Sequence, residues 1–284
     1  MARRRADFAG TWYPAGASDC EKMISEFIRS AAPCPAATER IGGILPHAGW
    51  VYSGAIACNV IKCLSEGASP ETVILFGRHL HPSSGNYLMK EGSWATPFGD
   101  LEIDEDLGES LSGEFSFRIE TANRYEQDNT VELQLPFVKY FFPETRILPM
   151  GVPPNTASLR IGEKVVELAG SLGRKIKVLG STDLTHYGLN YGFTPKGVGE
   201  TAVGWVKEEN DRRLVDLIVG MNAEGVIQEA LRNHNACCSG AVATAIAAAK
   251  RLGSRKAEKL VYSTSYDVRP DHSFVGYAGV VFVS

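Results

Sequence analysis

The 284-residue sequence contains no stretch that approaches the ~18–20 consecutive apolar residues of a transmembrane helix. It also contains no apolar segment behind its basic start, because MARRR is followed by ADFAG, so we expect no secretory signal. A net charge of −4 gives no excess of positive charge, which would favour nucleic acid or acidic membrane surfaces. These absences favour a cytoplasmic protein that binds neither nucleic acid nor membrane.

Cysteine is scarce, and its spacing does not follow the patterns of structural sites. The six cysteines include no CxxC pair, so they predict neither a disulfide framework nor a structural zinc site. Cys58 and Cys63 lie in an apolar helical pattern, where we expect buried, inert thiols. Cys237 differs from them because it comes directly before a helix.

The rest of the composition is that of an ordinary globular protein, with 44% hydrophobic and 22% charged residues. Short apolar runs, several of which end at glycine or proline, alternate with segments of helical spacing. The expected strands cover residues 41–45, 72–76, 146–150, 175–180, 259–265 and 275–283. This alternation predicts a single α/β domain over residues 1–284, with a central, largely parallel or mixed sheet flanked by helices.

Capping residues and helix breakers predict several helix boundaries. Ser18 and Glu21 have the spacing of a capping box at the start of the first helix. Pro136 predicts a kink in a helix over residues 130–140. Thr156 is expected to cap a long helix, which a left-handed residue at Gly173 would end.

Three histidines each come directly after a predicted strand. His47 follows IGGILP, His79 follows TVILFGR, and His186 follows IKVLGSTDLT. Ligands of open α/β sheets collect outside the carboxyl ends of the strands. An imidazole there can bind a metal or transfer protons near neutral pH. We therefore expect one site assembled from distant parts of the chain.

The second strand end offers more than one candidate. His81 lies two residues after His79, so in an extended segment both could be metal ligands or both could be surface residues. We favour His79 because it is nearer the strand end. Arg78 could bind a substrate carboxylate or phosphate, or could pair with an acid of the protein.

Asp183 lies three residues before His186, which places a carboxylate and an imidazole on one face if the segment turns helically. The carboxylate would then orient the imidazole and raise its basicity, as a general base or a metal ligand requires. The alternative is an Asx-turn formed by Asp183 beside a solvated histidine.

Cys237 lies at the start of an alanine-rich helix over residues 238–252, where the helix dipole favours a thiolate. The alternative is that Cys237 and Cys238 are two small residues that pack a tight helix start. His234 can be a residue of the preceding cap. The Glu132 carboxylate can support the residues of the site from behind without touching the ligand itself, or it can simply complement the dipole of its helix as an acid in the first turn.

These residues lie in segments that resemble the Memo family, which is related in fold to the class III extradiol ring-cleaving dioxygenases (LigB-like). The matching segments occur in family order over nearly the whole chain: AGTWYP, LPHAGWVYSG, ELQLPF, STDLTHYG, the AC of NACCSG, and VGYAGVVF. The resemblance implies a metal triad of His47, His79 and Cys237. It also implies that His186, beside Asp183, is the acid/base residue.

The chain departs from the family pattern at three places. FGRH stands where the family has GPxH, and DNTVE stands where it has EHSIE, so that Asn129 replaces a histidine. Cys238 occupies the position of a glycine. The metal triad survives these departures, whereas the polar lining of the pocket, and with it the substrate, does not carry over.

The triad favours a metal-dependent redox enzyme that uses a divalent metal, with Fe(II) as the first choice, on a small-molecule substrate. Non-haem iron oxygenases use two histidines and a carboxylate, and a thiolate in its place gives a softer site that also suits zinc or copper. Two alternatives remain open. The pocket can bind a metal or a ligand without turnover, or the protein can be a zinc hydrolase.

Overall fold

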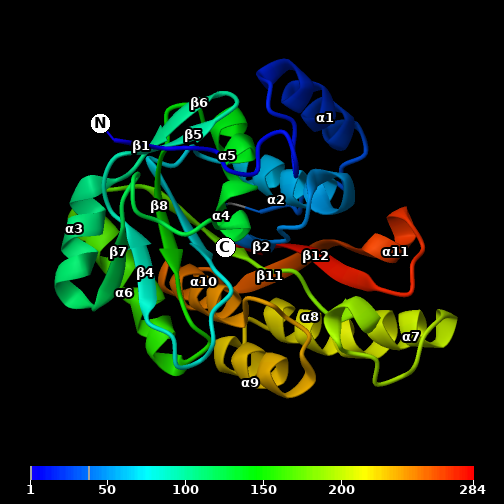
Figure 1. Cartoon of the computed structure of the whole chain (residues 1–284). Coiled ribbons are helices and arrows are strands. Elements are labelled where there is room, and N and C mark those ends of the chain that lie inside the picture. Colours follow the sequence, from blue (N-terminus) through cyan, green and yellow to red (C-terminus); the bar gives the residue numbers. More distant parts are fainter. Residues whose placement is uncertain (1, 38) are drawn as a thin grey trace.

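The computed structural model describes residues 2–37 and 39–284, and its centre is a twisted mixed sheet with helices on both faces (Figure 1). The strand order is β10-β12-β2-β9-β3-β8-β4-β7, and β11 pairs with β12. Strands β2, β9, β3 and β8 are parallel, and β12 and β4 flank them in the antiparallel direction. The predicted α/β fold with a mixed sheet is confirmed. The strands are β2 (Arg40–Leu45), β3 (Thr72–Gly77), β4 (Asn86–Met89), β7 (Phe117–Glu120), β8 (Arg146–Gly151), β9 (Ile176–Ser181), β10 (His186–Tyr187), β11 (Lys256–Thr264) and β12 (Phe274–Val283).

The central strands form because their apolar runs are covered on both faces. Every residue of β3 and of β12 is buried, as expected for strands between two layers of helices. Gly42 of β2 is paired with Val178 of β9, and a Cβ at Gly42 would lie 2.1 Å from the Val178 carbonyl oxygen. Glycine therefore lets β2 and β9 approach at the strand pair that leads to the site.

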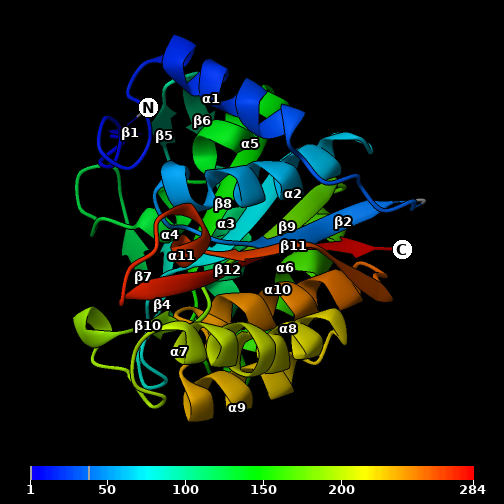
Figure 2. The same cartoon turned by 90° about the vertical axis from the view of Figure 1, so that its right-hand side faces the viewer.

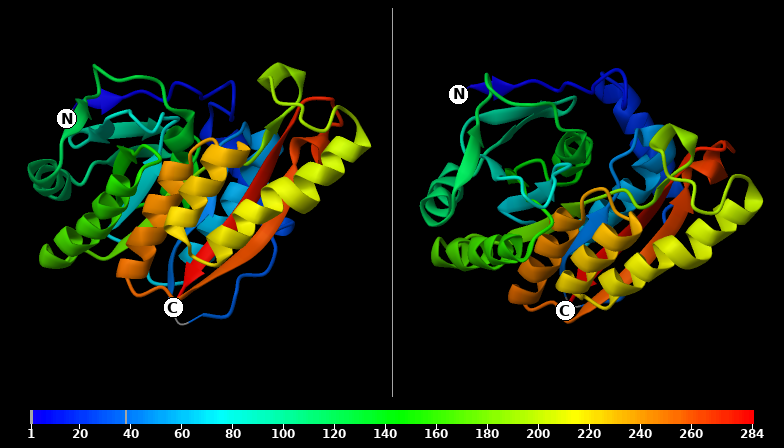
Figure 3. Two further views of the ribbon diagram at one scale, coloured as in Figure 1. Left: turned by 90° about the horizontal axis from the view of Figure 1, so that it is seen from below. Right: turned by 60° about the horizontal axis from the view of Figure 1, so that its bottom comes forward.

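The helices form one layer on each side of the sheet (Figure 2). Helix α2 packs on β2 and β12, with α1 and α5 against it. On the opposite face α10 packs on β9, β2 and β3, and α6, α10, α9 and α8 lie side by side (Figure 3). These helices are α1 (Ala17–Arg29), α2 (Ala55–Ser65), α5 (Leu135–Phe141), α6 (Thr156–Ser171), α8 (Asp211–Val219), α9 (Ala223–Asn233) and α10 (Ser239–Arg251).

A small second sheet lies near the N-terminus and contains Arg4, which is buried. The guanidinium of Arg4 lies 3.5 Å from the ring centroid of Trp94 and pairs with Glu120 at 3.2 Å. This sheet has the order β1-β5-β6. The remaining elements are β1 (Arg3–Arg4), β5 (Ser93–Thr96), β6 (Gly99–Glu102), α3 (Glu105–Glu114), α4 (Asn129–Glu132), α7 (Glu200–Trp205), α11 (Ser265–Val268), π-helical turns over Trp50–Gly54 and Val206–Asn210, and a 3₁₀ turn over Leu189–Tyr191.

Two of the predicted helix caps are wrong by one or two residues. Helix α1 begins after Gly16, which caps it without a side-chain hydrogen bond, so Ser18 and Glu21 form no capping box. Helix α6 is capped by Asn155, whose side chain accepts a hydrogen bond from a backbone N–H, rather than by Thr156. Asparagine in an extended conformation performs the same capping chemistry one position earlier.

Pro136 separates two helices instead of kinking one. Helix α4 ends before it, and α5 starts with the proline in its first turn, where the missing N–H has no helical partner. The end of α6 is as predicted, because Gly173 has a φ of 67°. Among the described residues, no helix is both long and apolar enough to cross a membrane.

The cysteine prediction is wrong for Cys63, which forms a disulfide with Cys34. Cys34 belongs to the proline-rich segment 33–37, which places it beside α2, a proximity that sequence spacing does not reveal. Cys58 is buried and free, as predicted. Burial raises the pKa of its thiol to about 12, which is consistent with an inert side chain.

Candidate metal centre

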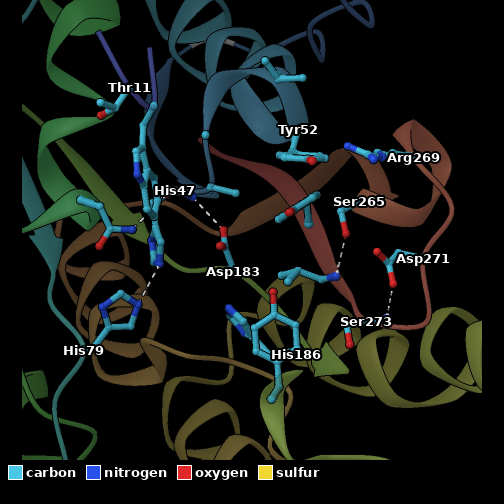
Figure 4. A pocket seen from close by; sticks show the side chains of 18 residues that line it. Thr11, His47, Tyr52, His79, Asp183, His186, Ser265, Arg269, Asp271 and Ser273 are labelled. Atoms are coloured by element: carbon cyan, nitrogen blue, oxygen red, sulfur yellow. Dashed lines mark hydrogen bonds between the residues drawn. The ribbon is translucent and has the colours of Figure 1, made fainter. Parts of the chain in front are cut away.

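The site lies outside the carboxyl ends of the parallel strands (Figure 4). His47 follows β2, His79 follows β3, and Cys237 comes just before α10. Asp183 follows β9, which lies between β2 and β3. Because parallel strands end at one edge of a sheet, residues that are 190 positions apart in the sequence reach the same place.

Three ligand atoms face one another at this edge. Nε2 of His47 lies 3.2 Å from Nε2 of His79 and 3.2 Å from Sγ of Cys237. Around a tetrahedral metal with ~2.0–2.1 Å bonds to nitrogen and ~2.3 Å to sulfur, two nitrogens stand ~3.3–3.4 Å apart and nitrogen and sulfur ~3.6 Å apart. The two observed separations are ~0.1–0.4 Å shorter than these values. The ligand atoms of His79 and Cys237 lie within 4.8 Å of each other, so modest side-chain shifts would let the three residues bind one ion.

The backbone and ring of His47 are held by three hydrogen bonds. Its Nδ1 lies 2.9 Å from Oγ of Ser181, and its backbone N–H donates to Oδ1 of Asp183 at 2.8 Å. Asn129 donates its side-chain amide to the His47 carbonyl oxygen at 3.2 Å. The Ser181 contact occupies one ring nitrogen, which leaves Nε2 directed at the other ligands, as a metal-binding histidine requires.

The local charges favour an ionised sulfur at Cys237. Burial opposes this, but a hydrogen bond from Cys238 and the neighbouring His47 outweigh it and lower the pKa of Cys237 well below its usual range. For His47, burial by itself would lower the pKa of the imidazole, but the neighbouring Asp183 and Cys237 raise this pKa to about 9. Burial raises the pKa of Asp183. The Cys237 thiolate is therefore the negative charge that would face a cation here, and His47 would have to give up its proton to bind a metal.

Backbone contacts hold the start of α10 against the segment after β9. The backbone N–H of Cys237 donates to the Asp183 carbonyl oxygen at 3.2 Å, and the Asp183 N–H donates to Sγ of Cys237 at 3.3 Å. Cys238 donates its N–H to Oγ1 of Thr182 at 3.1 Å. These contacts fix the sulfur of Cys237 relative to the strand that separates the two histidines.

His186 lines the same pocket as His47 and His79, but a different group orients it from the one expected. Nδ1 of His186 lies 3.2 Å from the Leu184 carbonyl oxygen. The Asp183 carboxylate accepts instead from the backbone N–H of His47. The role expected for Asp183, to orient the His186 ring, is therefore corrected to a role in holding His47.

The remaining candidates at the second strand end, His81 and Arg78, do not belong to the cluster of ligand atoms. His81 is exposed, and its Nδ1 lies 2.8 Å from Oγ of Ser83. Arg78 is buried and pairs with Glu120 at 2.9 Å and Glu126 at 2.8 Å. Of the two roles considered for Arg78, the structure shows the internal ion pair.

Glu132 is completely buried and anchors the N-terminal segment. Its carboxylate accepts hydrogen bonds from the backbone N–H groups of Asp7 and Phe8 at 3.0 and 2.7 Å, and from the Tyr13 hydroxyl at 3.0 Å. The segment that it holds includes two residues that line the pocket, Thr11 and Trp12. His234 has a φ of 51° and caps the end of α9, as one interpretation predicted.

The pocket beside two of the ligands, His47 and His79, has a volume of about 760 Å³, whereas Cys237 lines a neighbouring pocket that shares His186 with it. His47, His79 and His186 lie on one side of it, and Tyr52, Ser265, Arg269 and Asp271 lie across from them (Figure 4). Sequence analysis did not identify this second wall, because serine, aspartate and arginine near a chain turn carry no signal of their own.

Fold and site together define an α/β protein with a histidine and cysteine cluster suited to a metal. A model of the Memo-like protein family matches residues 4–281. A MEMO1 family protein of Pyrococcus abyssi is 34% identical, over 96% of this chain and 97% of the relative. A MEMO1 family protein of Pyrococcus furiosus is 32% identical, over 98% of each chain. The chain therefore belongs to the Memo family, as its motifs predicted.

The solved structures include an uncharacterized protein from Escherichia coli K12 that is similar to this chain. It is 11% identical, with a TM-score of 0.48, over 80% of this chain and 92% of that one.

Proposed function

We propose that this protein is a metal-dependent redox enzyme that acts on a small molecule, with the metal bound by His47, His79 and Cys237. One observation carries the proposal: three ligand atoms meet beside a pocket large enough for a small organic molecule. His79 is itself exposed toward solvent. A catalytic metal of this type has three protein ligands and keeps one position for substrate.

Iron is the metal that we propose, because it would supply electron-transfer and dioxygen chemistry beside the pocket. The protein's part is to hold the ligands. Ser181 fixes the ring of His47, and the start of α10 presents the Cys237 sulfur as the anionic ligand. A thiolate also suits zinc or copper, so the ligand set supports a soft metal as well as iron.

His186 is proposed as the residue that transfers protons to and from the substrate. Its Nδ1 is engaged by the Leu184 carbonyl oxygen, which leaves Nε2 as the nitrogen available to a bound molecule. Its ring also contacts Tyr191 edge-on, with centroids 5.0 Å apart, which limits its rotation. A fixed imidazole on the wall of the pocket has the position that general acid–base catalysis requires.

The far wall of the pocket supports a substrate with an anionic group. Arg269 is the one Lys or Arg among the described residues that line the pocket, and it is exposed. Trp12 and Tyr52, both about 40% exposed, lie at the same pocket and offer flat apolar surfaces. We therefore propose a small molecule with a planar apolar part and a carboxylate or phosphate directed at Arg269.

A second function, metal storage without turnover, is favoured by one feature of the site. The sulfur of Cys238 is close enough to the other three ligand atoms to belong to the same cluster. A site closed by four protein ligands is typical of a structural or stored metal rather than a catalytic one.

Oxygen uptake separates these two functions. The protein would be purified without oxygen, stripped of metal, reloaded with Fe(II), Cu(I) or Zn(II), and screened against planar organic acids for O₂ consumption. The redox proposal expects uptake with Fe(II) or Cu(I) that His186→Ala slows ~10²–10⁴-fold and His81→Ala retains. Metal binding without uptake for any substrate of this class would favour storage.

The proposal includes the cytoplasmic location expected from the sequence. The Cys34–Cys63 disulfide restricts it to a cytoplasm in which disulfides persist, as they do in hyperthermophiles.

A further inference from the structure

The thiol of Cys238 lies beside the proposed metal centre but is not one of its three proposed ligands. Its Sγ is 3.7 Å from Sγ of Cys237. It also lies within 4.8 Å of the ligand nitrogens of His47 and His79. Cys238 is only 3% exposed, so its sulfur is enclosed with the other ligands rather than directed into solvent.

The separation of the two sulfurs matches a shared metal. Two sulfurs bound to one tetrahedral ion at ~2.3 Å stand ~3.8 Å apart, close to the observed 3.7 Å. To bind the same ion, the Cys238 sulfur would also stand ~3.6 Å from each imidazole nitrogen. Starting from at most 4.8 Å, this needs a shift of up to ~1.2 Å, which a rotation of up to ~40° about the Cα–Cβ bond would supply, partly away from a staggered rotamer.

The position of Cys238 in the chain leaves its sulfur free for this role. Cys238 is the N-cap residue of α10, where serine, threonine, aspartate or asparagine would bond a helix N–H, but its side chain makes no such bond. Its backbone is fixed on both sides, by Thr182 at the N–H and by the Val242 N–H at the carbonyl oxygen. A rigid backbone therefore carries a buried thiol that has no capping function.

We propose that Cys238 is the fourth ligand of the resting metal centre, which then has two nitrogen and two sulfur ligands. The inference rests on the proposed metal centre but not on turnover. In the proposed enzyme, the thiol pair would keep the resting centre closed, and Cys238 would be the ligand that gives up its position to a substrate. The competing interpretation is that the Cys237 and Cys238 sulfurs only share an S–H···S hydrogen bond over the same 3.7 Å.

X-ray absorption of the zinc-loaded full-length protein counts the sulfurs directly. We expect two sulfur ligands per zinc in the wild type and one in Cys238→Ala. Cys58→Ala removes a buried thiol of α2 and is the matched control, with two sulfurs expected. Loading with Co(II) gives an independent measure, because Cys238→Ala should lose one of two thiolate contributions to the charge-transfer absorption.

One sulfur per zinc in the wild type would overturn the inference, and this outcome depends on no variant. Two sulfurs in Cys238→Ala would also overturn it, because the second sulfur would then come from elsewhere. Two sulfurs in a wild type that consumes no oxygen with any metal would leave this inference standing and remove the redox function. One sulfur per zinc in a wild type that consumes oxygen with a substrate would remove this inference and leave the redox function standing.

Discussion

Removal of the Cys34–Cys63 disulfide should lower the free energy of unfolding by about 3.6 kcal/mol. The bond joins residues 29 positions apart, and the chain-entropy relation gives this value for a loop of that length at 25 °C. Cys34→Ala is the suitable change because Cys34 lies partly exposed outside the helices, whereas Cys63 is fully buried in α2. Substitution of Cys34 therefore opens the loop without creating a cavity in the core.

Urea unfolding with and without a reductant measures the effect. The wild type without reductant should be more stable than Cys34→Ala by this amount, and reductant should bring the wild type to the level of the variant. Reductant should leave Cys34→Ala unchanged, which controls for effects on Cys237 and Cys238. Thiol titration of the denatured, unreduced wild type should find the four free cysteines. Six reactive thiols, or equal stability in both conditions, would refute the disulfide.

Three further predictions concern buried or pocket groups. Burial raises the pKa of Asp211 to about 6 in the folded protein, against ~3.9 in the unfolded chain. The stabilisation that this gives is complete below pH ~3.9 and is lost as the pH rises through 6, which lowers the free energy of unfolding by about 3 kcal/mol. Asp211→Asn should flatten the dependence of the urea-unfolding free energy on pH, and an unchanged dependence would contradict the prediction. Glu132→Gln replaces one buried acceptor oxygen with an NH₂ donor that faces N–H or O–H groups. The free energy of unfolding in urea should fall by about 1–3 kcal/mol. An unchanged free energy would contradict the anchoring role of Glu132. His186→Ala should keep the metal and reduce turnover ~10²–10⁴-fold, and a variant that loses metal instead would make His186 a ligand.

The main strands were predictable because burial on both faces leaves a plain sequence signal. Runs such as VILF (73–76) and ILPM (147–150) are apolar throughout and are each followed by a glycine. Strand β7 was missed because it lies at the edge of the sheet, where Arg118 and Ile119 are exposed and no apolar run forms. The short β1 was missed because two arginines read as a basic tail, although Arg4 is buried between aromatic rings and pairs with an acid.

The meeting of His47 and His79 could be predicted because backbone topology brings the ends of parallel strands together, whereas Cys237 was predicted from its place before a helix and from the family resemblance. The partners of individual side chains could not be predicted. The Asp183 carboxylate accepts from the backbone N–H of His47, which follows another strand, and the buried Cys238 sulfur lies 3.7 Å from the Cys237 sulfur. Both outcomes depend on side-chain directions that are set by tertiary contacts, and spacing in the sequence does not encode them.

The metal content of two histidine variants tests the proposed centre most directly. Wild type, His79→Ala and His81→Ala would be purified anaerobically, exposed to the same metal, and compared for bound metal per chain by elemental analysis. We predict one bound ion per chain in the wild type and in His81→Ala and clearly less in His79→Ala, because of these two histidines His79 is the one within ligand distance of His47 and Cys237. Equal metal in all three proteins, or loss only in His81→Ala, would contradict the proposed centre.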